Sequence, residues 1–131
     1  MSNPNHRRLN TFTLMLAATL TGLVWRLAPL HLPYFFFKYG GSALWAVALY
    51  FLIATIAPRA TSNRVALYAF AASAAVEFFR LVHTPAFDVF RETLAGKLLL
   101  GRFFSLKNIA AYWLAITIAA SLDALSRKST A

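Results

Sequence analysis

The sequence contains no cysteine, only 4 acidic residues, and only 13% charged residues in a chain of 131. The missing thiols exclude disulfide bonds, thiolate metal sites and a cysteine nucleophile. The shortage of charge is equally informative, because soluble domains carry about 25% charged and about 45–50% apolar residues. Here 60% of the residues are apolar, and the mean hydropathy is +0.60. We therefore expect a protein that is surrounded by lipid rather than by water.

Familiar catalytic and metal-binding motifs are also missing. The three histidines, His6, His31 and His83, are too scattered to suggest a zinc site, and no H-E-x-x-H motif is present. Arg80-x-x-His83 followed by Asp88 superficially resembles a lipid-phosphatase site, but the second histidine of such a site is absent. There is no Gly-rich phosphate loop and no Ser/His/Asp arrangement. We expect no cofactor, no metal and no catalytic residue, which favours a non-enzymatic role.

Four windows of low charge are each long enough, or nearly so, to cross a bilayer, which takes about 20 residues. Pro29 and Pro58 end the first two windows. The first window resembles a secretory signal, but it is too long and lacks a small-x-small cleavage site. The chain is predicted to be one all-α integral membrane domain, residues 1–131, a polytopic helical bundle. Its four transmembrane helices are predicted at residues 10–28, 41–57, 65–82 and 108–125.

The segment between the third and fourth spans differs from the rest of the chain. Residues 86–100 are too apolar for a free loop and too charged for a span. They are predicted to form an interfacial or re-entrant helix that ends at Gly101. A short fifth span is the alternative. The aromatic run at 34–37 suits a headgroup-level anchor, although packing between helices would explain it equally well.

Small and polar residues recur at helical spacing in the third and fourth spans, as on the protein-facing side of a membrane helix. In the third span these residues are Ser62, Ala66, Ala69, Ser73, Glu77, Arg80 and Thr84. In the fourth they are Ala111, Ala115 and Ala119. These stripes are predicted to face the neighbouring helices.

Basic residues fall into two sets on opposite membrane faces, and their numbers alone do not decide the orientation. The set that includes both termini is Arg7, Arg8, Arg59, Arg64, Arg127 and Lys128. The other set is Arg26, Lys38, Arg80, Arg91, Lys97, Arg102 and Lys107. The first set lies in bare polar flanks with only Asp123 nearby, as topology determinants do. We predict a multi-pass protein of the inner membrane with both termini in the cytoplasm.

The second basic set points to a binding site. An ionisable residue within a membrane helix costs about 2.5–3.5 kcal/mol, and Glu77 and Arg80 at i,i+3 can offset part of that cost by pairing. A purely structural ion pair is one alternative, and snorkelling of Arg26 to the headgroups is another. Together these charges would attract an anion, and a lipid phosphate is the nearest one. The predicted anion-binding residues are Arg26, Lys38, Arg80 and Arg91, with Glu77 orienting Arg80. The predicted supporting polar residues are Glu77, Asp88, Tyr39, Asn108 and Tyr112.

Several short motifs occur in a recognisable order. They include Lys38-Tyr39-Gly40-Gly41, Leu44-Trp45-Ala46, Glu77, Pro85, Phe87-Asp88, Arg91, Thr93-Leu94, Gly96, the run 98–101, Phe104-Ser105 and Tyr112. In order and spacing they resemble the bacterial membrane-protein family called domain of unknown function 2809. The resemblance runs from about Arg26 to Leu122 and is most specific over 85–112. It implies a short multi-span inner-membrane protein without an established activity. A more distant resemblance links the chain to VanZ-like proteins of glycopeptide resistance and the cell envelope.

Three positions depart from the pattern of that family. Ser42 and Asn108 stand where the resemblance implies acidic residues, and Arg80 stands where it implies glutamine. These departures make the predicted site more basic, which favours anion binding and weakens any role that needs the two carboxylates.

The leading hypothesis is a non-catalytic envelope protein that binds an anionic lipid or an isoprenoid phosphate at its outer face. The alternatives are a small oligomeric transporter or channel subunit, and a structural accessory subunit of a membrane complex. The net charge of +9 is divided between two membrane faces and does not indicate nucleic acid. We expect membrane lipid as the partner, and a protein partner or a homo-oligomer is compatible with the sequence.

Overall fold

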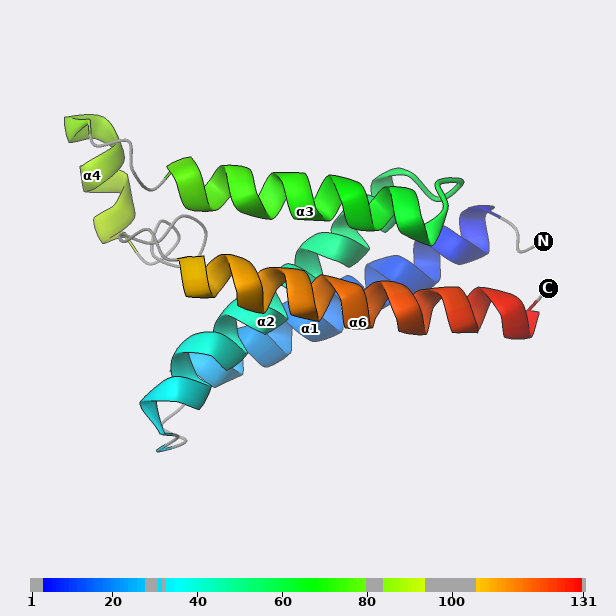
Figure 1. The fold of residues 1–131 in the computed structure, drawn as a ribbon, viewed down its shortest axis with the longest axis horizontal. Coiled ribbons are helices and arrows are strands. Elements are labelled where there is room, and N and C mark those ends of the chain that lie inside the picture. The colour runs from blue at the N-terminus through cyan, green and yellow to red at the C-terminus, as the bar shows by residue number, and fades with distance from the viewer. Residues whose placement is uncertain (1–3, 28–30, 32, 80–83, 94–105, 131) are drawn as a thin grey trace.

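The described part of the chain forms four long α-helices and one short one (Figure 1). The computed structural model describes residues 4–27, 31, 33–79, 84–93 and 106–130. The helices are α1 (Pro4–Leu27), α2 (Tyr34–Ile56), α3 (Ser62–Phe79), α4 (Pro85–Glu92) and α6 (Leu106–Thr130). These residues contain no strand, so the predicted all-α class is confirmed.

The long helices run up and down, with both chain ends at one end of the molecule (Figure 1). Helices α3 and α6 lie side by side and run in opposite directions, and α2 packs against α1, α3 and α6. In the described part of the chain, the backbone of α1 comes close to α2 alone. Any link between α1 and the α3–α6 pair therefore has to be made by side chains.

All four long helices begin before the predicted spans, and the difference is largest for α1 and α2. The predicted first span starts at residue 10, but α1 starts at Pro4, where a proline costs no hydrogen bond. The second span is predicted from residue 41, but α2 starts at Tyr34, directly after Pro33. The carbonyl of Pro33 accepts a hydrogen bond from the Phe37 N–H at 2.9 Å. The aromatic run is thus the first turn of α2 rather than a separate connecting segment.

The inner face of α3 carries the predicted stripe. Its buried residues are Ser62, Val65, Ala66, Ala69, Ser73 and Glu77. Arg80, predicted to extend this stripe, lies outside the described residues. On α6, Ala115 and Ala119 are buried as predicted, and Ala111 is half-buried. Small side chains let the helices approach closely, so the core consists largely of alanine together with Tyr50, Tyr112 and Ile116.

Polarity is distributed in the opposite way to a soluble protein. The buried polar side chains are Arg7, Thr11, Ser42, Ser62, Ser73, Glu77, Arg91, Asn108 and Asp123. The exposed large apolar side chains on the long helices include Leu9, Leu16, Leu20, Val24, Leu52, Leu67, Phe78, Leu114, Ile118 and Leu122. Soluble monomers rarely expose extended apolar surface. Two segments, Phe36–Ile56 and Lys107–Ser126, are long and apolar enough to cross a membrane.

The short helix α4 covers the first part of the segment predicted to lie at the interface. Val89 and Phe90 of α4 are exposed, whereas Arg91 is buried. The rest of the predicted helix at 86–100, apart from Thr93, lies outside the described residues, as does Gly101. Whether this segment is interfacial, re-entrant or a fifth span stays a prediction.

Candidate functional site

A buried polar cluster joins α2, α3 and α6 near the end of the molecule where α4 lies. The Tyr112 hydroxyl donates to Glu77 Oε2 at 3.1 Å, and Asn108 Nδ2 donates to Glu77 Oε1 at 3.5 Å. The Ser42 hydroxyl donates to Asn108 Oδ1 at 3.4 Å. We call Ser42, Glu77, Asn108 and Tyr112 the Glu77 cluster. A fully buried carboxylate of this kind is expensive in an apolar interior, so its partners matter for stability.

Sequence reasoning named most of the Glu77 cluster. Glu77, Asn108 and Tyr112 were predicted as supporting polar residues, and the structure brings all three together although they come from two helices. The Trp45 ring packs against the Tyr112 ring with centroids 5.2 Å apart, which fixes the position of the hydroxyl. The predicted pairing of Glu77 with Arg80 falls outside the described residues.

Arg91 attaches α4 to the end of α3. Its side chain is 2% exposed, and Nη2 donates to the Phe79 carbonyl at 2.9 Å. Nη1 donates to Asp88 Oδ1 at 3.4 Å. A guanidinium at the C-terminal end of a helix satisfies an orphan carbonyl and interacts favourably with the helix dipole. Arg91 and Asp88, both predicted site residues, therefore bond to each other, and Arg91 also bonds to the backbone carbonyl of Phe79.

Arg26 and Lys38 lie at the opposite side of the same end, around the first turns of α2. The Arg26 guanidinium lies over the Phe37 ring, 5.9 Å from its centroid, and Lys38 Nζ lies 5.4 Å from the centroid of Tyr39. Such cation–aromatic contacts stabilise a charge that lies near an apolar surface. The predicted residue Tyr39 thus supports Lys38.

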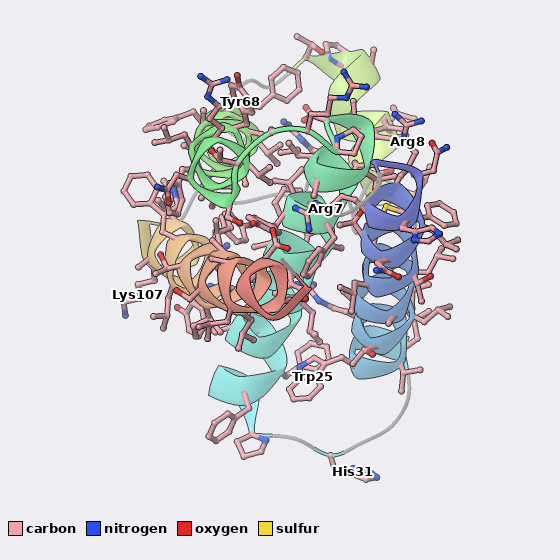
Figure 2. The ribbon with its side chains drawn as sticks, turned by 90° about the vertical axis from the view of Figure 1, so that its right-hand side faces the viewer. Arg7, Arg8, Trp25, His31, Tyr68 and Lys107 are labelled. Carbon is pink, nitrogen blue, oxygen red and sulfur yellow. The ribbon has the colours of Figure 1, made fainter. Side chains whose placement is uncertain are left out.

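The Gly40-Gly41 pair makes room for α1. Trp25 points from α1 toward α2 near their connection (Figure 2), and its Nε1 donates to the carbonyls of Phe36 and Phe37 at 3.0 and 3.2 Å. A Cβ atom at Gly40 would lie 2.5 Å from Trp25 Cζ2, and one at Gly41 would lie 2.5 Å from Arg26 Nε.

The two glycines should respond differently to alanine. In Gly40→Ala the new methyl group would clash with the Trp25 ring, which hydrogen bonds hold in place. We therefore expect a loss of about 1–3 kcal/mol in the free energy of unfolding. In Gly41→Ala the flexible Arg26 side chain can move aside, and alanine gains about 1 kcal/mol of helix propensity. We therefore expect Gly41→Ala to be close to neutral. Denaturant unfolding of both variants in detergent measures this; equal losses would contradict the packing described.

The structure does not gather the predicted cations into one described site. Figure 1 shows α4, which carries Arg91, on one side of the start of α6 and the α1–α2 connection on the other. In the part of the chain that the structure describes, the Arg91 guanidinium bonds to Phe79 and Asp88, whereas Arg26 and Lys38 contact the rings of Phe37 and Tyr39. Arg80 lies outside that part.

A second buried cluster, at the end with both termini, was missed by the sequence reasoning. The Arg7 guanidinium donates to both oxygens of Asp123, at 2.5 and 2.8 Å. The hydroxyls of Tyr50 and Ser62 donate to Asp123 Oδ2 at 2.6 and 3.2 Å. We call Arg7, Tyr50, Ser62 and Asp123 the Asp123 cluster; it takes one residue from each long helix. The interpretation of Arg7 as a bare flank charge is wrong, because its side chain is buried against Asp123.

Comparison with known proteins identifies the family. Residues 31–116 match the model of a family described as "Protein of unknown function (DUF2809)". The chain belongs to the DUF2809 family. No curated protein and no solved structure matches it. The resemblance stated from the sequence motifs is thereby confirmed.

The matched DUF2809 segment contains the complete Glu77 cluster and Arg91. It leaves out Arg7 and Asp123, so the Asp123 cluster lies only partly within it. The two neutral departures from the expected DUF2809 pattern, Ser42 and Asn108, are hydrogen-bonded to each other. Carboxylates at both positions would stand close to Glu77 and repel it, whereas the serine and asparagine leave one carboxylate with neutral partners from α6. Across the described residues, no three His, Asp or Glu side chains gather as a metal site would require.

Proposed function

We propose that this DUF2809 protein is a multi-pass protein of the bacterial inner membrane. In this proposal α1, α2, α3 and α6 all span the membrane, with both termini in the cytoplasm. It binds an anionic lipid or an isoprenoid phosphate at the periplasmic face and catalyses no reaction. The observation that supports membrane placement is the inverted polarity of the bundle. Charged clusters lie inside the bundle, and aliphatic and aromatic side chains cover the outside of all four long helices.

Lys38 and Arg26 are the residues that we assign to the anion. Lys38 lies at the start of the candidate span Phe36–Ile56, where hydrocarbon would give way to headgroups. Its ammonium lies against the Tyr39 ring, and no carboxylate within the described residues pairs with it. Arg26 lies beside the same turns of α2, over Phe37. Two cations with apolar side-chain stems and aromatic neighbours suit a phosphate at the membrane surface.

Arg91 has a different task in this proposal. Its guanidinium is occupied by the Phe79 carbonyl and Asp88, so we assign it to positioning α4 at the end of α3. Arg80 stays a predicted anion ligand.

Packing within the bundle favours binding over transport. Most of the buried residues between the Glu77 cluster and the Asp123 cluster are apolar: Ala46, Val65, Ala66, Ala69, Ala115, Ile116 and Ala119. Ser73 of α3 also lies between them, and its hydroxyl donates to the Phe70 carbonyl of its own helix. Tyr112 and Asp123 lie about 16 Å apart along α6, at about 1.5 Å per residue. Such an apolar layer would interrupt a polar path through a single copy of the chain.

Lipid binding to matched variants tests the proposal. We expect the double variant Lys38→Gln/Arg26→Gln to bind phosphatidylglycerol and a polyprenyl phosphate at least about tenfold more weakly, because each charged contact contributes about 1.5–3 kcal/mol. The measurement is titration of each lipid into phosphatidylcholine nanodiscs, followed by native mass spectrometry. Lys107→Gln is the control, since Lys107 is exposed at the same end and points away from the bundle (Figure 2).

Unchanged binding by the double variant would overturn the assignment of Lys38 and Arg26. Orientation is tested separately, with a reporter that is active only in the periplasm fused to Ala131. We expect no reporter activity, and activity there would reverse the proposed orientation.

A further inference from the structure

A shallow groove runs between α1 and α2 at the end with both termini. It has a volume of about 290 Å³ and is lined by Asn5, Arg8, Leu9, Phe12 and Thr55. Its apolar wall is accessible: Leu9 is 63% exposed and Phe12 is 43% exposed. The groove lies at the opposite end of the molecule from Lys38 and Arg26, so it is a separate feature from the proposed periplasmic site.

Arg8 is held at this groove by the end of α2. Its Nε donates to the Thr55 carbonyl at 3.1 Å. Thr55 lies in the last turn of α2, where carbonyls have no partner within the helix. This bond orients the guanidinium and leaves both Nη groups without a hydrogen bond to the described residues. Planar Nη groups in a fixed orientation suit bidentate recognition of phosphate.

Among the described residues, no carboxylate forms an ion pair with Arg8. Arg7, the preceding residue, is neutralised by Asp123 inside the bundle. Figure 2 shows the contrast, with Arg7 pointing between the helices and Arg8 on the outer side of α1. Arg8 therefore presents a full positive charge at the rim of an apolar groove.

The level of the groove relative to a membrane follows from α2. The candidate span Phe36–Ile56 ends one residue after Thr55, which places Arg8 where hydrocarbon meets headgroups. Leu9 and Phe12 lie further along α1, toward the hydrocarbon. A phosphate at Arg8 would thus continue into an acyl chain over these two side chains.

We infer that this groove binds one anionic phospholipid of the cytoplasmic leaflet, with its phosphate on the Nη groups of Arg8 and an acyl chain along Leu9 and Phe12. The inference rests on the membrane placement in the proposed function but not on Lys38 or Arg26. Binding needs both the phosphate headgroup and the acyl chain of the lipid, because the groove offers one charged group and a mostly apolar wall.

Native mass spectrometry with phosphatidylglycerol as the probe tests this site. We expect Arg8→Gln to reduce the affinity of one bound lipid about tenfold, the effect of losing one charged hydrogen-bonding group. Arg8→Lys should lose part of that affinity, because lysine keeps the charge but not the bond geometry. Arg64→Gln, an exposed arginine at the same end of the molecule, is the matched control and should bind as the unaltered protein does.

Two further comparisons separate the possible outcomes. Glycerol 3-phosphate carries the phosphate without chains and should not compete for the site; competition would mean that a free phosphate suffices and would overturn the inference. Equal losses in Arg8→Gln and Arg64→Gln would indicate general surface attraction and would also overturn it. Because Lys38→Gln/Arg26→Gln should spare the Arg8 site, the two proposals can fail independently.

Discussion

Replacing Asp123 with asparagine is expected to lower the free energy of unfolding by about 3–5 kcal/mol, the usual cost of leaving one partner of a buried ion pair behind. Asparagine cannot balance the charge of Arg7, whose guanidinium donates to both Asp123 oxygens. The hydroxyls of Tyr50 and Ser62 would also lose a charged acceptor. Denaturant unfolding in detergent, followed by circular dichroism, measures the loss.

The size of this effect follows from the position of α1. Its backbone approaches α2 alone among the described helices, so the bond from Arg7 to Asp123 is its side-chain connection to α6. Without that bond the first turns of α1 lose this contact with α6 and keep the bonds of Arg8 and Thr11 to Thr55 of α2. We therefore expect increased protease cleavage near Arg7 in the variant as well as a lower unfolding free energy.

Two controls separate the ion pair from a general charge effect. Asp88→Asn removes a carboxylate whose side chain is 52% exposed and lies 3.4 Å from the buried Arg91, which keeps its bond to the Phe79 carbonyl. Because water screens this pair and asparagine keeps an acceptor oxygen, the variant should cost about 1 kcal/mol. Removing both charges, in Arg7→Met/Asp123→Leu, should recover part of the loss, because no buried charge is then left uncompensated. If Asp123→Asn lowers the free energy of unfolding no more than Asp88→Asn does, the hydrogen bonds of the Asp123 cluster are not formed in the folded protein.

Helical spacing was enough to predict the inner face of α3. Ser62, Ala66, Ala69, Ser73 and Glu77 were identified as one stripe, and all are buried. Each helix in a bundle has one face that must be compatible with its neighbours, and small or polar residues mark that face independently of the partner. Local sequence therefore contains this information.

The Asp123 cluster could not be predicted from local sequence. Arg7 and Asp123 are 116 positions apart, and an arginine before a membrane span is typical of a topology determinant. One signal was present: Asp123 is the single acidic residue within the last predicted span, and an up-and-down topology brings that end of α6 to the start of α1. A buried charge needs a partner, and Arg7 was one of the six basic residues predicted at that level.

The sequence predicted at which end of the molecule the anion-binding residues lie, but it did not predict which of them lie next to one another. Sequence placed Arg26, Lys38 and Arg91 at the same membrane face, and the structure places them at the same end of the molecule. It separates them across that face, on either side of the start of α6 (Figure 1). Span order predicts which end a residue occupies, but only helix packing decides which residues meet there.

Replacing Glu77 with leucine is the second change with a large expected effect. Glu77 is 0% exposed and accepts hydrogen bonds from Tyr112 and Asn108. Leucine would leave both donors in an apolar interior without an acceptor, at about 1–3 kcal/mol for each. We expect the free energy of unfolding to fall by about 2–6 kcal/mol, measured by denaturant unfolding in detergent as for Asp123→Asn.

Glu77→Gln and Ser73→Ala provide the comparison. Glutamine keeps one acceptor oxygen at nearly the same place, so it should cost about 1 kcal/mol. Ser73, one turn earlier on α3 and equally buried, donates to the Phe70 carbonyl of its own helix. Ser73→Ala should therefore be close to neutral, because alanine favours the helix. An unfolding free energy of Glu77→Leu equal to that of Ser73→Ala would mean that the Glu77 cluster contributes nothing to holding α3 against α6.

The same variants distinguish a structural role of the Glu77 cluster from a role in binding. Glu77 accepts hydrogen bonds from Tyr112 and Asn108 of α6, and Asn108 accepts one from Ser42 of α2. The Ser42 hydroxyl also lies 3.1 Å from the backbone carbonyl of Lys38, whose ammonium lies against the Tyr39 ring. Glu77→Gln should therefore leave phosphatidylglycerol binding at the Lys38–Arg26 site unchanged per folded molecule. A tenfold loss of that binding in Glu77→Gln, with stability preserved, would instead make the buried carboxylate part of the anion site. The assignment of the bound anion would then have to move from the start of α2 into the interior between α3 and α6.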